Sequence, residues 1–303
     1  MRGGATYIFY RFLAFVIRAM PRSLAHWIGL RLCDAAYFLN RRARESVEEN
    51  LATVWAYQDL TPSAGHLRGC ARKTFQYFGK YAADFIRFRA MPPDRLRQFV
   101  SVSGLAEVEK LRAAGRGGII LTLHYGNWEL GGAYFAAHGF NVHAVVQPVA
   151  SPPMERIYTF FRRQRGMDVI PLARAATGIT RALRRGDLVA MVGDRDFTGT
   201  GLPHDFMGRP AILPPGAAWF AHKLNVPILF GSIRREPDDT YAIRLSPLIT
   251  PEAYPTETAI QDRLVALMEQ TILSDPCQWF TFYPFWRTTP ALAHPAPVSP
   301  GAY

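Results

Sequence analysis

The segment Gly117-Gly-Ile-Ile-Leu-Thr-Leu-His-Tyr-Gly-Asn-Trp-Glu129 decides the fold. Residues 117–123 form a nearly continuous apolar run, which is typical of a strand buried on both faces of a sheet. Gly126 allows the chain to turn, and the residues after it predict a helix to about His138, with Gly139 as its C-terminal stop. The segment therefore predicts a strand, a turn and a helix, as in a parallel α/β fold.

The same alternation continues toward the C-terminus. Ser151-Pro152 opens one helix, because serine caps helices well and proline is favoured at the first helical position. Repeated β-α units imply right-handed crossovers, so we expect an α/β fold with a mostly parallel central sheet flanked by helices on both faces. The expected strands are 117–123, 141–146, 169–172, 188–192, 227–233 and 241–245, and the expected helices are 43–56, 65–91, about 128–138, 152–166, 176–185 and 256–273.

The N-terminal segment, residues 1–44, is predicted to be a basic, membrane-associating helical extension of an α/β domain over 45–303. Arg11 and Arg18 lie seven residues apart, on one face of an otherwise apolar helix. Arg11 interrupts the run of about 18 apolar residues that a membrane span needs, and no small-residue cleavage site follows as in a secretory signal. We therefore expect an interfacial helix with its arginines at anionic headgroups; a helix that packs on the core is the alternative.

Aromatic residues follow one another at steps of three or four within the second predicted helix. Such a stripe is usually part of a hydrophobic core, and this is the expectation here; a groove for an acyl chain is the alternative. The stripe consists of Phe75, Phe78, Tyr81, Phe85 and Phe88.

The charge of the chain is concentrated in two places. The 35 basic residues exceed the 24 acidic ones by 11, and all but four of the basic residues are arginines, which suit bidentate contacts with phosphate or carboxylate. Residues 1–44 carry a net charge of +7 and residues 162–185 a net charge of +6. We therefore expect anionic partners at these two patches, and not nucleic acid, because no zinc-finger spacing or RNP-type aromatic motif accompanies them.

Several classes of site are disfavoured. Cys33, Cys70 and Cys277 are odd in number and far apart, which fits neither a disulfide framework nor a metal or redox motif and favours a reducing compartment. The sequence has no G-x-S-x-G elbow, no phosphate-binding P-loop, no H-E-x-x-H pair and no complete G-x-G-x-x-G. We therefore expect neither a metal ion nor a bound cofactor.

His124 is the candidate for the chemistry. It stands at the carboxyl end of the first predicted parallel strand, where open α/β sheets bind ligands, and the turn at Gly126 brings Glu129 toward its imidazole. A carboxylate on one ring nitrogen raises the basicity of the other, which then takes a proton from a substrate hydroxyl. No Ser or Cys lies in the motif, so we expect direct attack by that hydroxyl on an acyl donor, without an acyl-enzyme. A histidine held by structural hydrogen bonds is the alternative.

The spacing His124-x4-Glu129, with Gly-Asn-Trp between, resembles the H-x4-[DE] motif of the lysophospholipid acyltransferase superfamily, in the form of the lipid A late (lauroyl and myristoyl) acyltransferases. Further segments fall in an order similar to that of this family, so the resemblance covers roughly 5–287. They are Asn50-Leu51, Arg162-x3-Gly166, Leu183-Arg-Arg-Gly186, Asp194-Arg-Asp196, Phe206-x-Gly208-Arg209, Pro215-Gly216 and Pro276-x-Gln278-Trp279.

The resemblance implies the roles of the site residues. His124 is expected to be the general base, with Glu129 orienting it. Arg162, or Arg163 beside it, is expected to bind a substrate phosphate or the developing oxyanion. Substrate contacts are also expected from Asn127, Asp194 and Asp196; the two aspartates follow strand 188–192 and either orient Arg162, contact a sugar hydroxyl or cap a loop.

The resemblance also implies the partners. The donor is acyl carrier protein or, in some members, acyl-CoA, each a co-substrate thioester, and the acceptor is a glycolipid or phospholipid hydroxyl. The reaction is expected on the anionic surface of the bacterial inner membrane, at its cytoplasmic face. Because acyl carrier protein is acidic, the remaining arginines, such as Arg184 and Arg185, are candidates for docking it.

Two departures weaken the expectation of a lipid A precursor as acceptor. The segment 280–286 is Phe-Thr-Phe-Tyr-Pro-Phe-Trp, where lipid A enzymes usually have Trp, His and basic residues, and Gln147 stands where they often have arginine. Both features are similar to the branch with phosphatidylinositol-mannoside acyltransferases. Acylation of that glycolipid or of a lysophospholipid therefore stays open, as does a lipid-binding membrane protein without turnover.

Overall fold

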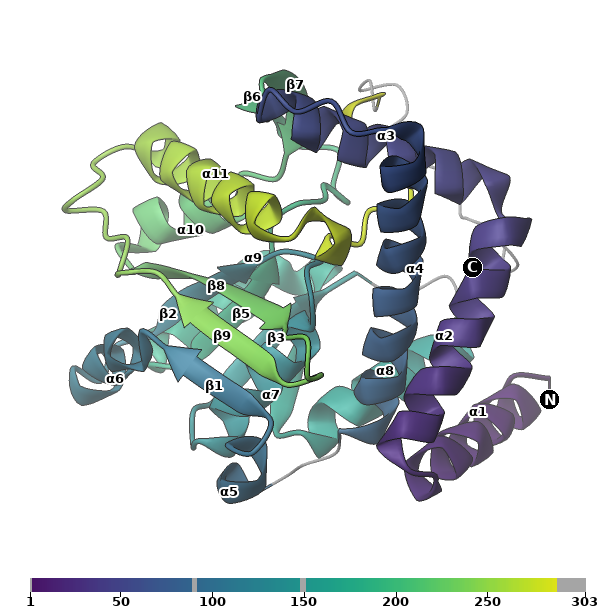
Figure 1. The fold of residues 1–303 in the computed structure, drawn as a ribbon. Helices are drawn as coiled ribbons and strands as arrows, with labels where there is room; N and C mark the ends of the chain where they lie inside the picture. Colours follow the sequence, from purple (N-terminus) through teal and green to yellow (C-terminus); the bar gives the residue numbers. More distant parts are fainter. Residues whose placement is uncertain (1, 89–91, 148–150, 288–303) are drawn as a thin grey trace.

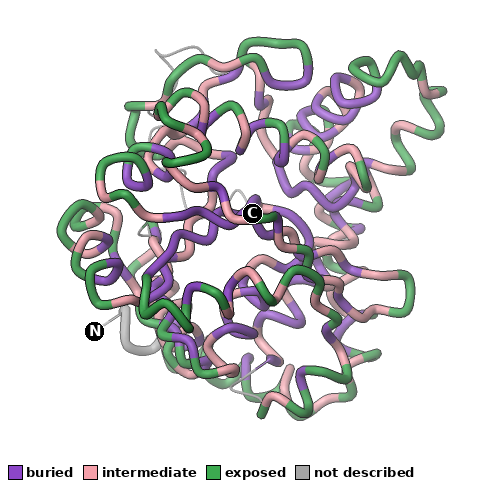
Figure 2. The backbone as a smooth tube through the Cα atoms, turned by 90° about the vertical axis from the view of Figure 1, so that its left-hand side faces the viewer, coloured by how far each residue is buried: buried purple, intermediate pink, exposed green. Residues whose placement is uncertain are grey.

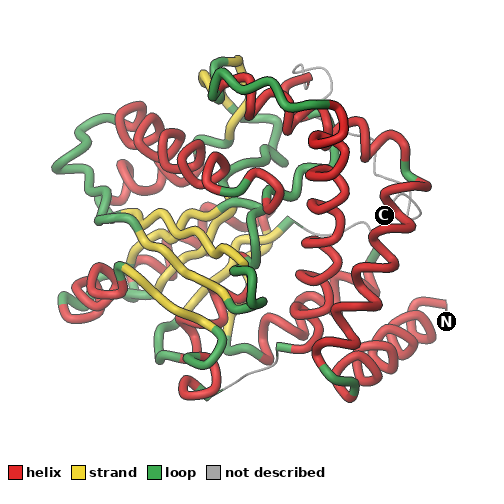
Figure 3. The backbone as a smooth tube through the Cα atoms, in the orientation of Figure 1, coloured by secondary structure: helices red, strands yellow, loops and turns green. Residues whose placement is uncertain are grey.

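The computed structural model of the chain describes residues 2–88, 92–147 and 151–287. Its centre is a seven-stranded sheet in the order β1-β9-β8-β2-β5-β3-β4, and every pairing in it is parallel except that of β8 with β9. The predicted mostly parallel sheet with flanking helices is confirmed (Figures 1 and 3). The strands of this sheet are β1 (Val100–Ser103), β2 (Gly118–Thr122), β3 (Val142–Val146), β4 (Met167–Pro171), β5 (Leu188–Val192), β8 (Ile228–Arg235) and β9 (Tyr241–Leu245).

Helices cover both faces of the sheet, and most residues of its central strands are buried (Figure 2). One face packs against α9 (Ala175–Arg184), α10 (Gly216–Leu224) and α11 (Glu257–Ser274). The other packs against α5 (Pro93–Leu96), α6 (Leu105–Ala113) and α7 (Trp128–Ala137). The short hairpin of β6 (Leu202–Phe206) and β7 (Arg209–Leu213) stands apart from the main sheet.

Four long helices come before the short α5 and the first strand of the sheet. They are α1 (Arg2–Ala19), α2 (Arg22–Leu39), α3 (Arg41–Tyr57) and α4 (Ala64–Arg87). The last helix was expected to reach residue 91, but it ends at Arg87, and 89–91 lie outside the described residues. Figure 1 shows α2 and α4 side by side; a Cβ on Gly29 would lie 2.6 Å from the carbonyl oxygen of Gly79, so only glycines allow this approach. The division of the chain at residue 44 stays a prediction.

Arg18 of α1 bonds the protein, and this corrects the expectation that its guanidinium lies at lipid headgroups, whereas Arg11 is exposed and stacks on an aromatic ring. The guanidinium of Arg11 lies 4.1 Å from the ring centroid of Phe160 on α8 (Pro152–Gln164). Nε of Arg18 donates to the carbonyl oxygen of Ile86 at the end of α4, 2.9 Å away, and Arg87 donates in return to the carbonyl oxygen of Ile17 at 2.6 Å. The orphan carbonyls at both helix ends attract these side chains inward.

Several large apolar residues of α1 and α2 are exposed. Phe12 and Phe15 are 63% and 67% exposed, and Trp27 on α2 is 57% exposed. Among the described residues, none of the helices combines the length and the apolar character that crossing a bilayer requires.

Candidate active site

His124 lies in the turn between β2 and α7, and Glu129, the other residue of the His-x4-Glu motif, lies in the first turn of α7. Gly126 has φ +58°, and a Cβ there would lie 1.7 Å from the carbonyl oxygen of Ile233 on β8, so the turn requires glycine. The backbone N–H of Gly126 donates to the carbonyl oxygen of Gln278 at 3.0 Å, and that of Asn127 donates to Ile233 at 3.1 Å. The turn is therefore fixed between β8 and the segment that follows α11.

His124 is bound by Asp194, a residue of the loop after the neighbouring strand β5. Nδ1 of His124 lies 2.8 Å from Oδ1 of Asp194, and the side chain of the histidine is 27% exposed. Because a carboxylate only accepts hydrogen bonds, Nδ1 carries the proton and Nε2 is the basic nitrogen. Both oxygens of Asp194 also accept from the backbone N–H of His124, and Nε1 of Trp279 donates to Oδ2 at 2.9 Å.

Glu129 does not reach His124, and this corrects its expected role as the group that orients the base. Its buried carboxylate accepts from Nη2 of Arg162 at 2.5 Å and from Nε of the same guanidinium at 3.1 Å. Arg162 comes from α8, which packs beside the N-terminal end of α7 and draws the carboxylate away from the imidazole. The candidate site thus contains two separate charge pairs, His124–Asp194 and Arg162–Glu129.

Both carboxyl groups are ionised, although they are buried. Burial raises the pKa of Asp194, but the charge and hydrogen bond of His124 and the indole N–H of Trp279 outweigh it, and the net pKa is lowered. Burial likewise raises the pKa of Glu129, and the charge and hydrogen bonds of Arg162 lower it further than burial raises it. Each carboxylate is therefore charged at neutral pH and hydrogen-bonds its partner, His124 or Arg162.

Three other predicted site residues lie elsewhere or do different work. Asn127, predicted to contact substrate, is 1% exposed: its Oδ1 caps α7 by accepting from the N–H of Leu130, and its Nδ2 donates to the hydroxyl of Tyr241. Both its polar ends are therefore used internally. Asp196 caps its own loop by accepting from the backbone N–H groups of Thr198 and Gly201, the loop-capping role left open from the sequence. Arg163 is exposed on α8.

Sequence reasoning gave no role to three residues that support the site. Trp279 and Gln278 were noted only as part of a motif, yet they hold Asp194 and Gly126; their signal was the order of the motif segments. Arg165, 4% exposed, donates to the carbonyl oxygens of Phe85 and Phe88 at the end of α4, and burial lowers its pKa to about 10.

The aromatic stripe of α4 is mostly core, as expected. Phe75, Tyr81 and Phe85 are at most 7% exposed. The ring of Tyr81 stacks on Trp128 at 4.3 Å between centroids, and Trp128 meets the imidazole of His124 edge-on at 5.1 Å. The stripe therefore packs against the aromatic side chain that contacts His124.

A cavity of about 1170 Å³ lies away from this turn, between α3 and the β6–β7 hairpin, with Arg42, Thr53 and Arg209 in its lining. Within residues 2–88, 92–147 and 151–287, no three His, Cys, Asp or Glu side chains are grouped so that they would hold a metal ion.

Comparison with known proteins points to one family. The family model described as bacterial lipid A biosynthesis acyltransferase matches residues 3–288. A phosphatidylinositol mannoside acyltransferase of Mycolicibacterium smegmatis is 24% identical over 275 residues, which cover 89% of this chain and 88% of the relative. The protein of that name from Mycobacterium tuberculosis is 23% identical over 258 residues, 83% of this chain and 80% of the relative. The crystal structure of the 1-acyl-sn-glycerophosphate (LPA) acyltransferase PlsC from Thermotoga maritima aligns with a TM-score of 0.41 at 13% identity, covering 84% of this chain and 99% of that chain.

Proposed function

The chain belongs to the bacterial lipid A biosynthesis acyltransferase family, and we propose that it moves a fatty acyl chain from a thioester donor to a hydroxyl group of a membrane glycolipid. The family resemblance seen in the sequence is thereby confirmed, and the protein is an acyltransferase that uses an acyl donor and a lipid acceptor. The observation that carries the finer proposal is the contact of 2.8 Å between His124 and Asp194 at the carboxyl edge of the sheet.

His124 acts as the general base. Its Nε2 takes the proton of the acceptor hydroxyl while the oxygen attacks the thioester carbonyl carbon. The tetrahedral intermediate then collapses, the carbon–sulfur bond breaks, and the imidazolium returns the proton to the leaving thiolate. Asp194 stabilises the imidazolium between these two transfers, since its carboxylate faces Nδ1. No residue of the protein is acylated in this scheme.

Arg162 supplies positive charge to the site. Its pair with Glu129 uses Nε and Nη2, so Nη1 is the nitrogen that faces an anionic group of a substrate or the oxyanion. Glu129 therefore acts by holding the guanidinium in place, and both residues are needed for transfer even though neither touches His124.

Acyl transfer by the purified protein tests this proposal. The assay supplies acyl carrier protein thioesters and acyl-CoA separately, with lipid A precursors, phosphatidylinositol mannosides and lysophospholipids as acceptors, and detects products by mass spectrometry. His124→Ala is expected to lower kcat by a factor of about 10²–10⁴ while leaving the fold intact. Transfer at the wild-type rate by this variant would rule out the mechanism, and no transfer from any donor would favour a lipid-binding protein.

A phosphatidylinositol-mannoside-type glycolipid is the second candidate acceptor. The relatives from Mycolicibacterium smegmatis and Mycobacterium tuberculosis carry that name, and the match to each covers at least 80% of its length. The assay separates this acceptor from a lipid A precursor. Acylation of a phosphatidylinositol mannoside but not of a lipid A precursor would assign the protein to the phosphatidylinositol-mannoside acyltransferases.

The exposed apolar residues of α1 and α2 support association with the membrane surface. Burying one phenyl side chain stabilises binding by about 2 kcal/mol, so several in one face suffice for a peripheral contact. Replacement of Phe12 and Phe15 by serine, which touches no described ion pair, is expected to reduce cosedimentation with vesicles of anionic phospholipid. Unchanged cosedimentation would refute this contact surface.

A further inference from the structure

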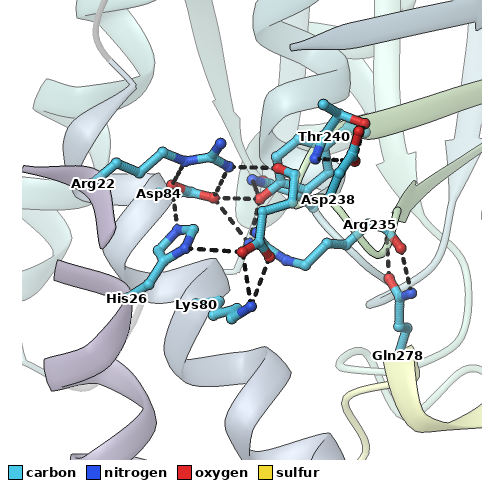
Figure 4. A network of polar contacts seen from close by, with 11 residues as sticks. Arg22, His26, Lys80, Asp84, Arg235, Asp238, Thr240 and Gln278 are labelled. Atoms are coloured by element: carbon cyan, nitrogen blue, oxygen red, sulfur yellow. Dashed lines mark hydrogen bonds and ion pairs between the residues drawn. The ribbon is translucent and has the colours of Figure 1, made fainter. Parts of the chain in front are cut away.

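A buried charge network joins the N-terminal helices to the sheet (Figure 4). Its centre is Asp84 on α4, which is 0% exposed and accepts from Arg22 and His26 on α2, at 2.8 Å and 2.9 Å. Arg235 of β8 donates to the same carboxylate at 2.9 Å, and the hydroxyl of Tyr241, at the start of β9, donates at 2.6 Å. One carboxylate therefore holds together α2, α4 and two strands.

Two routes lead from this carboxylate to the turn with His124 and Glu129. The first passes through Tyr241, whose hydroxyl accepts from Nδ2 of Asn127 at 3.1 Å, and Asn127 caps the helix that carries Glu129. The second passes through Arg235. Its backbone N–H and C=O form a pair of 2.8 Å hydrogen bonds with the side chain of Gln278, whose own carbonyl accepts from Gly126.

Asp84 is ionised in this setting. Burial raises its pKa, but the hydrogen bonds of His26 and Arg22 and the charge of Arg235 lower the pKa far below its usual value. Removing its charge leaves the buried guanidinium of Arg235 and the half-buried guanidinium of Arg22 without their central partner, and the hydroxyl of Tyr241 loses the acceptor that fixes its direction.

We propose that Asp84 is a positioning residue for acyl transfer, which acts through Tyr241 and Asn127 on the turn between His124 and Glu129. It touches no reacting atom. Its effect on rate arises because a misplacement of about 1 Å in a catalytic group can cost roughly 10²-fold. This inference rests on the proposed function for its kinetic part only.

The chain offers a matched control. Asp34 also accepts from an arginine across the interface of α2 and α4, with Arg72 donating to its two oxygens at 2.7 Å and 3.0 Å, but no described contact leads from it to the turn. Asp84→Asn and Asp34→Asn therefore break the same kind of ion pair between the same two helices. Only the first is expected to affect the site.

The experiment measures kcat and KM for both substrates together with hydrogen–deuterium exchange of the amides of residues 124–131. For Asp84→Asn we expect kcat to fall roughly tenfold to hundredfold, KM to change little, and hydrogen exchange in the turn to rise. If Asp84→Asn fails to fold, Tyr241→Phe takes its place, with the same expected result. For Asp34→Asn we expect wild-type kcat and exchange. Tyr241→Phe and Asn127→Ala are expected to be non-additive in kcat, because they interrupt one route.

Wild-type kcat and exchange in Asp84→Asn, or equal losses in both aspartate variants, would overturn the proposal. Exchange needs no turnover, so it separates this failure from failure of the proposed function. If His124→Ala stays active while Asp84→Asn loosens the turn, the mechanism is wrong and the positioning route stands.

Discussion

Replacing Asp194 by asparagine is expected to move the proton of the His124 imidazole from Nδ1 to Nε2, which tests the proposed role of His124 as the base. Trp279 Nε1 is a donor only, so the amide oxygen of the new side chain must face it, because two opposed donors cost about 1–3 kcal/mol. The amide NH2 then occupies the position of Oδ1, 2.8 Å from Nδ1 of His124, and donates to that nitrogen. Nδ1 becomes the acceptor, Nε2 carries the proton, and the histidine no longer acts as a base.

The expected loss in kcat is about 10⁴, the size found when a base is held in the wrong tautomer, which corresponds to about 5.5 kcal/mol. Steady-state acyl transfer with saturating donor and acceptor measures it, and KM is expected to change little. Asp187→Asn is the matched control: Asp187 accepts from a second histidine, the buried His143, at 3.0 Å, at the opposite end of the strand from the turn. A kcat for Asp194→Asn within tenfold of wild type would refute the role of Asp194.

Three further variants test other contacts. For Gly126→Ala, whose Cβ would lie 1.7 Å from the oxygen of Ile233, we expect lower melting temperature and lost transfer, measured by thermal unfolding and the transfer assay; wild-type values would contradict the turn geometry. Glu129→Gln leaves the largely buried guanidinium of Arg162, whose side chain is 15% exposed, without its counter-charge. We therefore expect the free energy of unfolding, measured in urea, to fall by about 3–5 kcal/mol, and adding Arg162→Gln to restore part of it. Equal stability of Glu129→Gln and wild type would contradict the pair. The pKa of Asp84 lies far below its unfolded value of about 3.9, so its contribution is complete above about pH 5 and decreases as pH falls below 4. Urea unfolding between pH 7 and 3 is therefore expected to show a flatter curve for Asp84→Asn, and an unchanged slope would argue against that pKa.

Strand β2 was predictable because it is buried on both faces of the sheet and therefore almost entirely apolar. Residues 118–122 are all buried, and the chain reverses after the helices at Gly139 and Gly186, both of which have φ +82°. Strand β1 was missed because Val100–Ser103 alternates polar and apolar residues over only four positions. The β6–β7 hairpin was missed because Pro203 and Pro210 argue against strands.

The site was predictable as a location more than as a set of contacts. The apolar runs placed both His124 and Asp194 at the carboxyl edge of the sheet. Their meeting depends on β2 lying next to β5 with Thr122 opposite Val192, so that each is two residues beyond a paired position, and no local pattern gives the strand order. The direction of Glu129 was mispredicted because it depends on Arg162, which a separate helix brings in from 33 residues away.

The arginines that bond helix-end carbonyls bear on how the protein responds to salt. Arg18, Arg87 and Arg165 use their guanidinium groups on backbone oxygens inside the fold. Added ions screen exposed charges over about 8–10 Å and act much less on such internal bonds. Raising the ionic strength therefore weakens attraction between the remaining surface cations and an anionic partner without loosening the helices. The ionic-strength dependence of binding is then expected to report fewer cations than the 35 lysines and arginines of the sequence.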